Sequence, residues 1–295
     1  MTTISSETRK VGSMIVITGA TGALNGATVE HLLTQVPAAE IAVVARDTEK
    51  ARSFADRGIE VRYGDYAVPD SLPGAFTGAD QLLLVSSSDP AADAVALHRA
   101  AIDASVAAGV GRVLYTSHQG AAADTPFGPG RDHAATEQLL AESGLAWTSL
   151  RNGFYMHSLQ WLLGPWRETS VIAVPADGAV SWTSRSEAAE AAAAIILSGG
   201  AYDGPVTITA GDAPTFEDIA AIASEVTGRA VRFEVIDPED WIRAQTAAGT
   251  PEFMAHFQLG MYQAAAHGYF NGTDPLLHTL IDHEPQTVRD YLAGA

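Results

Sequence analysis

A glycine-rich turn near the N-terminus has the residue types and spacing that point most directly to chemistry. It reads Thr18-Gly19-Ala20-Thr21-Gly22-Ala23-Leu24-Asn25-Gly26 and lies between an apolar run and an amphipathic stretch. A pyrophosphate needs backbone N–H groups at a helix N-terminus with no Cβ in the way, and a strand, glycine turn and helix in this order supply them. We therefore expect a dinucleotide to bind at Gly19, Thr21, Gly22, Ala23 and Leu24.

The glycine spacing follows the pattern G-x-x-G-x-x-G at two of its three positions. Gly19 and Gly22 match, whereas Asn25 stands at the third position and Gly26 follows it. The third glycine normally allows the helix to pack closely on the strand, so Asn25 leaves the fine geometry of the turn open. The alternative interpretation is a tight turn that binds no ligand.

The end of the second predicted strand bears on which dinucleotide binds. Arg46 and Asp47 directly follow the apolar run 41–45. An acidic residue there would bond the ribose 2′-hydroxyl of NAD, whereas an arginine would pair with the 2′-phosphate of NADP. Because Arg46 comes first and Asp47 also suits a helix cap, we favour NADP(H). The alternative is that Arg46 is a solvated surface charge.

Three further predicted strands end in polar residues. These residues are Asp65 and Tyr66, then Ser86, Ser87 and Ser88, then Thr116 and Ser117. Ligands of open parallel sheets bind beyond the carboxyl ends of the strands, so we expect all of them to line the cofactor site, with Asp65 near the adenine amine. Ordinary turn chemistry is the alternative.

The elements that would position these residues alternate between strand-like and helix-like patterns. The predicted strands are 14–18, 41–45, 59–63, 81–86, 112–117 and 146–151, and the predicted helices are 26–36, 48–57, 91–108 and 132–143. Such alternation predicts a parallel sheet covered by helices. The predicted fold class is α/β, a Rossmann-type doubly wound parallel sheet with a smaller α/β C-terminal substrate lobe.

The sequence changes character after Asn152, where aromatic-rich loops alternate with short strand-like runs at 171–174, 206–209 and 231–236. We interpret residues 1–13 as a flexible extension and 14–152 as an NADP-binding domain. Residues 153–295 would mainly form the substrate-binding lobe, while a helix within 181–200 returns to the first domain.

Composition excludes several classes of function. Asp and Glu number 35 against 17 Lys and Arg, so the net charge of −18 repels nucleic acid. The absence of cysteine excludes disulfides and thiolate chemistry. No apolar run is long enough to cross a bilayer, and the nine histidines show no metal-ligand spacing. We expect a cytoplasmic protein that binds neither metal, membrane nor nucleic acid.

The acid–base pair of typical short-chain dehydrogenases is missing. Those enzymes use Tyr-x-x-x-Lys, in which the lysine lowers the pKa of the phenol. The only lysines here are Lys10 and Lys50, and neither follows a tyrosine at that spacing. The corresponding predicted helix offers His133 and Glu137 instead. His133 would donate a hydrogen bond near the nicotinamide or the substrate, the alternative being a local bond at the helix start.

Together these motifs resemble the NmrA-like, atypical short-chain dehydrogenases. The resemblance rests on segments 18–26, 64–66, 82–88, 133–137 and 150–155 together with Arg46, and it extends from Met14 to the C-terminus. Within that group the sequence is most similar to NADPH-dependent quinone oxidoreductases and triphenylmethane reductases.

The resemblance implies an NADP-binding Rossmann lobe and a cleft for a flat aromatic acceptor such as a quinone. It places Asn152, Gly153, Phe154 and Tyr155 beside the nicotinamide and the acceptor, which makes His133, Asn152 and Tyr155 the catalytic candidates. Phe154 and Tyr155 would alternatively pack between the lobes. A quinone is electron-poor enough to accept hydride directly, so positioning would do most of the work.

Two other functions remain open at this point. The chain would alternatively bind NADP as a redox sensor without turnover, or reduce one particular natural product. A homodimer is also possible.

Overall fold

The structure is a computed structural model that describes residues 13–87, 89 and 92–294. The chain forms two compact units. The first contains the described residues up to Ser117, with Asp132–Arg151 and Ser186–Val206. The second contains His118–Arg131, Asn152–Arg185 and the described residues from Thr207 onward. Ser88 and residues 1–12 of the predicted extension 1–13 lie outside the described residues.

A seven-stranded sheet forms the centre of the first unit, in the order β10-β6-β5-β4-β1-β2-β3. The strands are β1 Ile15–Thr18, β2 Ile41–Ala45, β3 Glu60–Tyr63, β4 Gln81–Leu84, β5 Arg112–His118, β6 Ala146–Asn152 and β10 Gly204–Ile208. β1 pairs in parallel with both β2 and β4, β2 with β3, and β4 with β5. The order β3-β2-β1-β4-β5-β6 is that of a doubly wound sheet, which confirms the predicted fold class.

The central strands form because their sequences are apolar without interruption. β1 (IVIT), β2 (IAVVA) and β4 (QLLL) are buried along their whole length. Continuous burial is typical of parallel strands that helices cover on both faces. β3 (EVRY) lies at the edge of the sheet and is more exposed.

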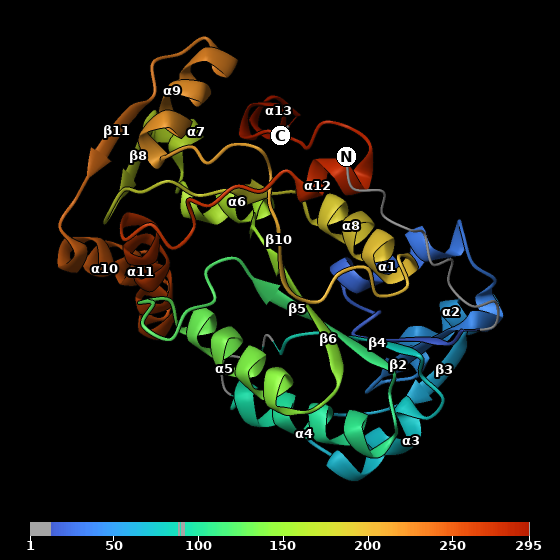
Figure 1. Cartoon of the computed structure of the whole chain (residues 1–295). Coiled ribbons are helices and arrows are strands. Elements are labelled where there is room, and N and C mark those ends of the chain that lie inside the picture. The colour runs from blue at the N-terminus through green and yellow to red at the C-terminus, as the bar shows by residue number, and fades with distance from the viewer. Residues whose placement is uncertain (1–12, 88, 90–91, 295) are drawn as a thin grey trace. The chain divides into compact units, whose positions relative to one another are not determined.

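Helices cover both faces of this sheet (Figure 1). On one side lie α3 Leu72–Phe76, α4 Ala94–Ala107 and α5 Gly128–Glu142, and on the other α1 Ala23–Leu33 and α8 Arg185–Leu197. Alternate strand residues supply the core under α3, α4 and α5, including Val16, Leu82, Leu84, Val113 and Tyr115. Helix–sheet packing therefore places these strand residues in the core, so residues that could meet a ligand lie at the ends of the strands.

Several predicted helix boundaries are wrong. Segment 48–57 forms a 3-10 turn at Glu49–Ala51 and the short α2 Arg52–Ala55, in which only Ala51 and Phe54 are buried. With so little apolar surface to bury, a longer helix has no packing to stabilise it. α1 begins at Ala23 instead of residue 26, and α5 begins at Gly128 instead of residue 132.

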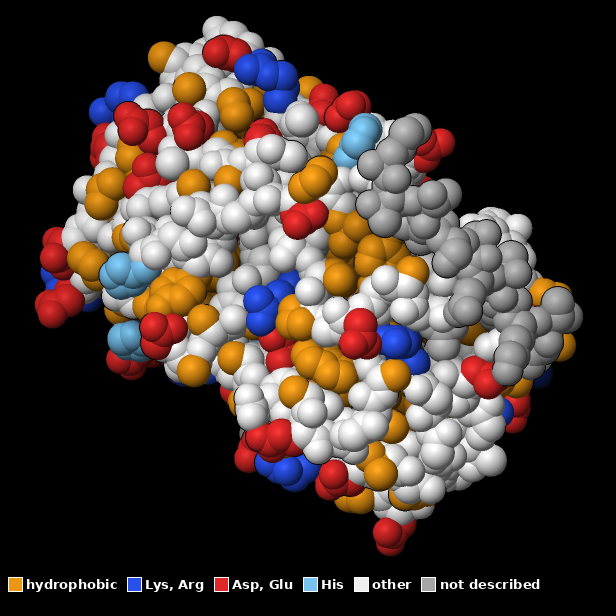
Figure 2. Space-filling view, viewed as in Figure 1, with side chains coloured by type: hydrophobic (Ala, Val, Ile, Leu, Met, Phe, Trp, Pro, Cys, Tyr) orange, Lys and Arg blue, Asp and Glu red, His pale blue; other side chains and the backbone are white. Residues whose placement is uncertain are grey.

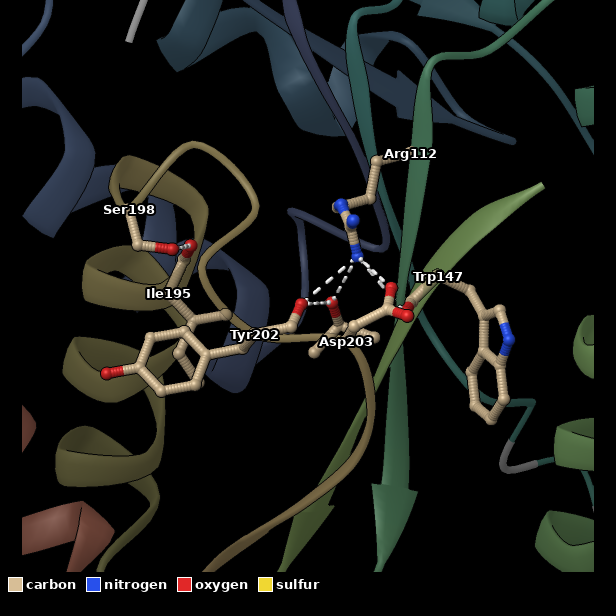
Figure 3. A network of polar contacts seen from close by, with 7 residues as sticks. Arg112, Trp147, Ile195, Ser198, Tyr202 and Asp203 are labelled. Atoms are coloured by element: carbon tan, nitrogen blue, oxygen red, sulfur yellow. Dashed lines mark hydrogen bonds and ion pairs between the residues drawn. The ribbon is translucent and has the colours of Figure 1, made fainter. Parts of the chain in front are cut away.

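β10 is the main topological correction. We predicted a strand at 206–209 among the short strands of the C-terminal lobe, but β10 extends the central sheet beside β6. Arg112 holds the segment before β10 against β6. The Nη1 of Arg112 donates to Trp147 O and Tyr202 O at 3.1 Å and to Asp203 Oδ1 at 2.9 Å (Figure 3). These partners come from distant parts of the sequence, so no local pattern signals the pairing.

The second unit contains two parallel strand pairs and an aromatic core. β8 Val171–Val174 pairs with β11 Arg232–Val235, and β7 Phe154–Tyr155 pairs with β9 Trp182–Thr183. The helices are α6 Leu159–Leu162, α7 Trp166–Thr169, α9 Phe216–Thr227, α10 Pro238–Ala247, α11 Glu252–Ala266, α12 Leu276–Ile281 and α13 Val288–Gly294. The core includes Phe127, Phe154, Trp182, Phe216, Tyr262 and Phe270.

Candidate functional site

The junction between β1 and β4 is the point at which the order of the sheet reverses, and ligands of doubly wound sheets bind there. Gly19 follows β1 with φ +65°, and a Cβ on it would lie 2.6 Å from Val85 Cγ1, just beyond β4. An L-residue is therefore excluded twice at this position, by its backbone conformation and by Val85. The turn after β1 lies directly against the end of β4 because it begins with glycine.

The turn leads directly into α1, and no side chain caps the first backbone N–H groups of this helix. Gly22 N donates to Gly19 O at 2.9 Å, and Gly22 is the N-cap residue. No side chain caps α1, and Thr21, Gly22 and Ala23 are exposed. A helix N-terminus with free donors, a partial positive charge and no obstructing Cβ fits a pyrophosphate.

Asn25 and Gly26 divide the role of the third motif glycine. Asn25 is 1% exposed, and its Nδ2 donates to Thr18 O at 2.8 Å. A Cβ on Gly26 would lie 2.8 Å from Ala20 O, so Gly26 permits the close approach of α1 to the turn. The departure from the motif therefore shifts the close contact by one residue and does not open the turn.

The end of β2 presents one free cation and one engaged carboxylate. Arg46 is exposed and has no ion pair or hydrogen bond with any other described residue. Asp47 Oδ1 accepts hydrogen bonds from the backbone N–H groups of Glu49 and Lys50, at 3.1 and 3.4 Å. Asp47 thus serves the local turn, which leaves Arg46 as the side chain available to a ligand.

The polar residues after β3 mostly bind the protein itself. Asp65 Oδ1 accepts from Ala67 N at 3.0 Å, which is turn chemistry. The Tyr66 hydroxyl lies 2.7 Å from Thr18 Oγ1 and donates to Val85 O at 3.2 Å, and burial raises its pKa. Tyr66 therefore ties the β3 loop to the ends of β1 and β4, and its hydroxyl is not free for a cofactor.

Ser86, Ser87 and Thr116 come together at the ends of β4 and β5. Ser86 N donates to Thr116 Oγ1 at 2.8 Å, and that hydroxyl donates to Ser86 Oγ at 3.3 Å. Ser87 N donates to His98 Nε2 at 2.7 Å. These bonds fix the backbone, and both serine side chains are half-buried. The prediction for Ser88 falls on a residue outside those described.

One buried histidine, His98, and one buried tyrosine, Tyr115, pack beside His133. Burial lowers the pKa of His98 to about 4, so His98 is neutral, accepts at Nε2 and donates from Nδ1 to Thr136 Oγ1 at 2.8 Å. Nδ1 of His98 cannot also accept from Tyr115, whose hydroxyl lies 2.8 Å from His133 Nδ1. Tyr115 instead hydrogen-bonds to His133 Nδ1, and this bond holds the His133 ring in place.

Glu137 is a structural residue whose role the sequence did not reveal. Its carboxylate is 6% exposed and accepts from Ser117 Oγ and Ser149 Oγ at 2.7 Å and from Arg151 Nε at 2.9 Å. The same pairing raises the pKa of Arg151. Glu137 thus joins α5 to β5 and β6, and the Ser117 hydroxyl, which we predicted for the cofactor, is committed to it.

In the second unit, Asn152 orients Tyr155. Asn152 is 3% exposed, its Nδ2 donates to the Tyr155 hydroxyl at 3.1 Å, and its Oδ1 has no hydrogen-bond partner among the described residues. Burial is the main reason that the pKa of Tyr155 is raised, so the phenol stays protonated. Because the phenol oxygen accepts from Asn152, its own proton points to another acceptor.

Gly153 and Phe154 serve packing. A Cβ on Gly153 would collide with Thr183 and lie 2.8 Å from Ser181 O, so a glycine is required where β7 meets β9. The Phe154 ring is 7% exposed and contacts Trp182 and Phe270 at centroid distances of 5.5 Å. The Phe154 side chain therefore packs in the aromatic core of the second unit.

His118 is a further buried histidine that the sequence did not single out. It packs against Phe127, Phe154 and Phe270, and burial lowers its pKa to about 4. Its Nδ1 accepts from Gly120 N at 3.0 Å, so the ring is neutral with its proton on Nε2. Its position at the end of β5, where site residues of such sheets occur, was the signal available in the sequence.

Two features are absent from the described residues. None of its helices is long and apolar enough to span a membrane. No three His, Cys, Asp or Glu side chains among these residues are grouped so as to hold a metal ion.

Comparison with known proteins identifies the relatives of this chain. A model of the NmrA-like family matches residues 12–292. Quinone oxidoreductase 2 of Escherichia coli is 35% identical, over 94% of this chain and 96% of that protein. A crystal structure of the NADPH-dependent quinone oxidoreductase of E. coli complexed with NADPH has a TM-score of 0.86 at 32% identity, covering 95% of this chain and 99% of the other. The triphenylmethane reductase of Citrobacter sp., complexed with NADP(H), has a TM-score of 0.84 at 32% identity, with the same coverage.

Replacing Gly19 tests whether the turn holds a diphosphate. We expect Gly19→Ala to weaken NADPH binding at least tenfold. The alanine would have to adopt the left-handed backbone conformation of Gly19, and its Cβ would collide with Val85. The backbone alone would lower the free energy of unfolding by about 1–2 kcal/mol. Calorimetric titration and thermal unfolding measure the two effects. Gly74→Ala is the control, since its Cβ meets nothing. Equal NADPH affinity in Gly19→Ala and the wild type would contradict the assignment.

Proposed function

The chain belongs to the NmrA-like family, and we propose that it is an NADP(H)-dependent oxidoreductase that reduces a quinone or a similar conjugated aromatic acceptor. The observation that carries this proposal is the uncapped N-terminus of α1 behind Gly19, at the point where the sheet order reverses. The names of the relatives, which include a quinone oxidoreductase and a triphenylmethane reductase, support the acceptor class.

In this proposal the first unit binds the dinucleotide. The N–H groups around Thr21, Gly22, Ala23 and Leu24 bind the pyrophosphate, and Arg46 pairs with the 2′-phosphate. Arg46 suits this role because it has no counter-ion among the described residues, whereas Asp47 is engaged by its own turn. The chemistry that NADPH supplies when bound is hydride donation from C4 of its nicotinamide.

The remaining predicted contacts have different roles in the proposal. Asp65, Ser86 and Ser87 lie at the ends of β3 and β4, and in this proposal their half-buried side chains contact the dinucleotide. Thr116 acts by holding Ser86, and Tyr66 and Ser117 act by holding the strand ends. These last three therefore shape the site, and their hydroxyls bind protein groups.

The proton that completes the reduction comes from this chain's own donors. A quinone that has accepted hydride carries one oxyanion, and one protonated donor neutralises it. Tyr155 has a phenol kept protonated by burial and oriented by Asn152. Tyr115 holds the His133 ring through Nδ1, and in this proposal His133 Nε2 carries the proton. We assign proton donation to Tyr155 and a hydrogen bond to the bound nicotinamide or substrate to His133, so that no Tyr-x-x-x-Lys pair is needed.

An acceptor panel tests the proposed function. Purified protein should consume NADPH when benzoquinone or naphthoquinone is added, because such acceptors take hydride without a strong acid catalyst. The measurement is the loss of NADPH absorbance, with the protein-free mixture as control. Dinucleotide binding without turnover over a broad panel would instead identify a redox sensor.

Arg46→Ala should weaken NADP⁺ binding by about tenfold and leave NAD⁺ binding unchanged. A tenfold loss is at the lower end of the range for a hydrogen bond to a charged group, because Arg46 is exposed. Titration calorimetry with both dinucleotides gives the ratio. Arg52→Ala is the matched control, since Arg52 is an exposed arginine of the same unit that pairs with Glu49. An unchanged ratio of the two affinities in Arg46→Ala would place the 2′-phosphate elsewhere.

Tyr155→Phe should reduce turnover most for acceptors whose reduced oxyanion is strongly basic, by about 100-fold or more, which is the range for general acid catalysis. For strongly electron-poor quinones the loss should be small. The exposed Tyr63→Phe is the control. If His133→Gln shows this acceptor-dependent loss and Tyr155→Phe does not, the proton comes from His133.

A further inference from the structure

Arg185 is a half-buried cation without a counter-ion. It begins α8, its Nη2 donates to His157 Nε2, and its guanidinium carbon lies 5.7 Å from the centroid of the Tyr155 ring. It forms no ion pair with any carboxylate in the described chain, Glu187 two residues later included. Its Nε is buried and has no hydrogen-bond partner there. A buried donor on a charged group is costly unless a partner of opposite charge meets it.

Arg185 is half-buried, whereas Arg46, Arg99, Arg131 and Arg229, which also have no carboxylate partner among the described residues, are exposed. The chain has a net charge of −18, and acidic and basic side chains are spread over the same face in Figure 2. Eight described arginines form ion pairs with carboxylates, namely Arg52, Arg57, Arg62, Arg112, Arg151, Arg232, Arg243 and Arg289. Carboxylates are therefore abundant, and Arg185 remains unpaired among them.

The neighbours of Arg185 hold it in place without neutralising it. His157 accepts from the guanidinium, and burial together with the Arg185 cation lowers the pKa of His157, so the imidazole is neutral. Tyr155 and His157 stack with a centroid distance of 5.9 Å. Two aromatic rings thus position a positive charge that has no carboxylate partner among the described residues.

We propose that Arg185 is the binding residue of an anionic subsite for the electron acceptor, so that the preferred acceptor is a planar conjugated compound with a carboxylate, sulfonate or phosphate substituent. The proposal rests on the proposed function, because it takes Tyr155, over whose ring Arg185 lies, as the residue that meets the acceptor. Arg185 would supply the charge complement and the planar hydrogen-bonding fork that such groups prefer.

The test compares naphthoquinone with its sulfonate as acceptors. Arg185→Gln should lower kcat/KM for the sulfonate at least tenfold more than for naphthoquinone, mainly through KM, because only the sulfonate loses a charged partner. Arg185→Lys should recover part of the difference. Arg167→Gln is the matched control, because Arg167 also lies over an aromatic ring, that of Trp166, in the same unit. Arg167→Gln should retain the wild-type ratio of the two acceptors.

A binding measurement separates this proposal from the proposed function. Naphthalenesulfonate, which cannot be reduced, should bind the wild type saturated with NADP⁺ at least tenfold more tightly than it binds Arg185→Gln. If this difference is found while no quinone is turned over, the subsite stands and the proposed function fails. Equal binding to both proteins, an equal loss for both acceptors, or a matching loss of NADP⁺ affinity would overturn the subsite.

Discussion

The contact between the turn after β1 and the end of β4 is the constraint on which the candidate site depends. Two parallel strands that leave the sheet side by side must turn in opposite directions, and only a residue without Cβ can occupy the position of Gly19 against Val85. Thr18 strengthens the same junction, because its hydroxyl accepts from Val85 N and donates to Leu83 O. With these contacts made, α1 begins at Ala23, directly after the turn.

Polar side chains around this junction have separate duties. Tyr66, Ser117 and Glu137 are satisfied by protein partners and hold the strand ends in register. Arg46 and the first turn of α1 lack such partners. A polar group that is satisfied by the protein contributes to rigidity, whereas one without a protein partner at the site is available to a ligand. The same distinction separates Glu137 from Arg185.

The sheet could be predicted well from the sequence because its strands are uninterrupted apolar runs. β2 begins and ends at the predicted residues, and β1, β3 and β5 differ from prediction by one residue. The family resemblance is likewise confirmed. Helix ends were less predictable; the N-cap of α1, for example, is Gly22, which carries no side chain that marks a cap. β10 was misplaced because strand neighbours depend on long-range contacts such as that of Arg112 with Tyr202.

The part of the site that is formed by backbone groups could be predicted from the sequence. The part that is formed by networks of hydrogen-bonded side chains could not. The glycine turn and its helix follow from local spacing. The three hydrogen bonds that Glu137 accepts from side chains form only because β5 and β6 lie side by side. The chain of bonds from Ser87 through His98 to Thr136 likewise joins segments far apart in sequence. A pattern of residue types cannot distinguish a serine that meets a ligand from one that meets a buried carboxylate.

The missing cap of α1 has a thermodynamic consequence. A helix end that no residue of its own chain completes is completed by whatever anion occupies it, so the occupant becomes part of the folded structure. Its binding energy adds to the stability of the native state as RT ln(1 + [L]/Kd). The melting temperature of this protein should then report the dinucleotide pool around it, and amide exchange in the first turn of α1 should slow as that pool fills.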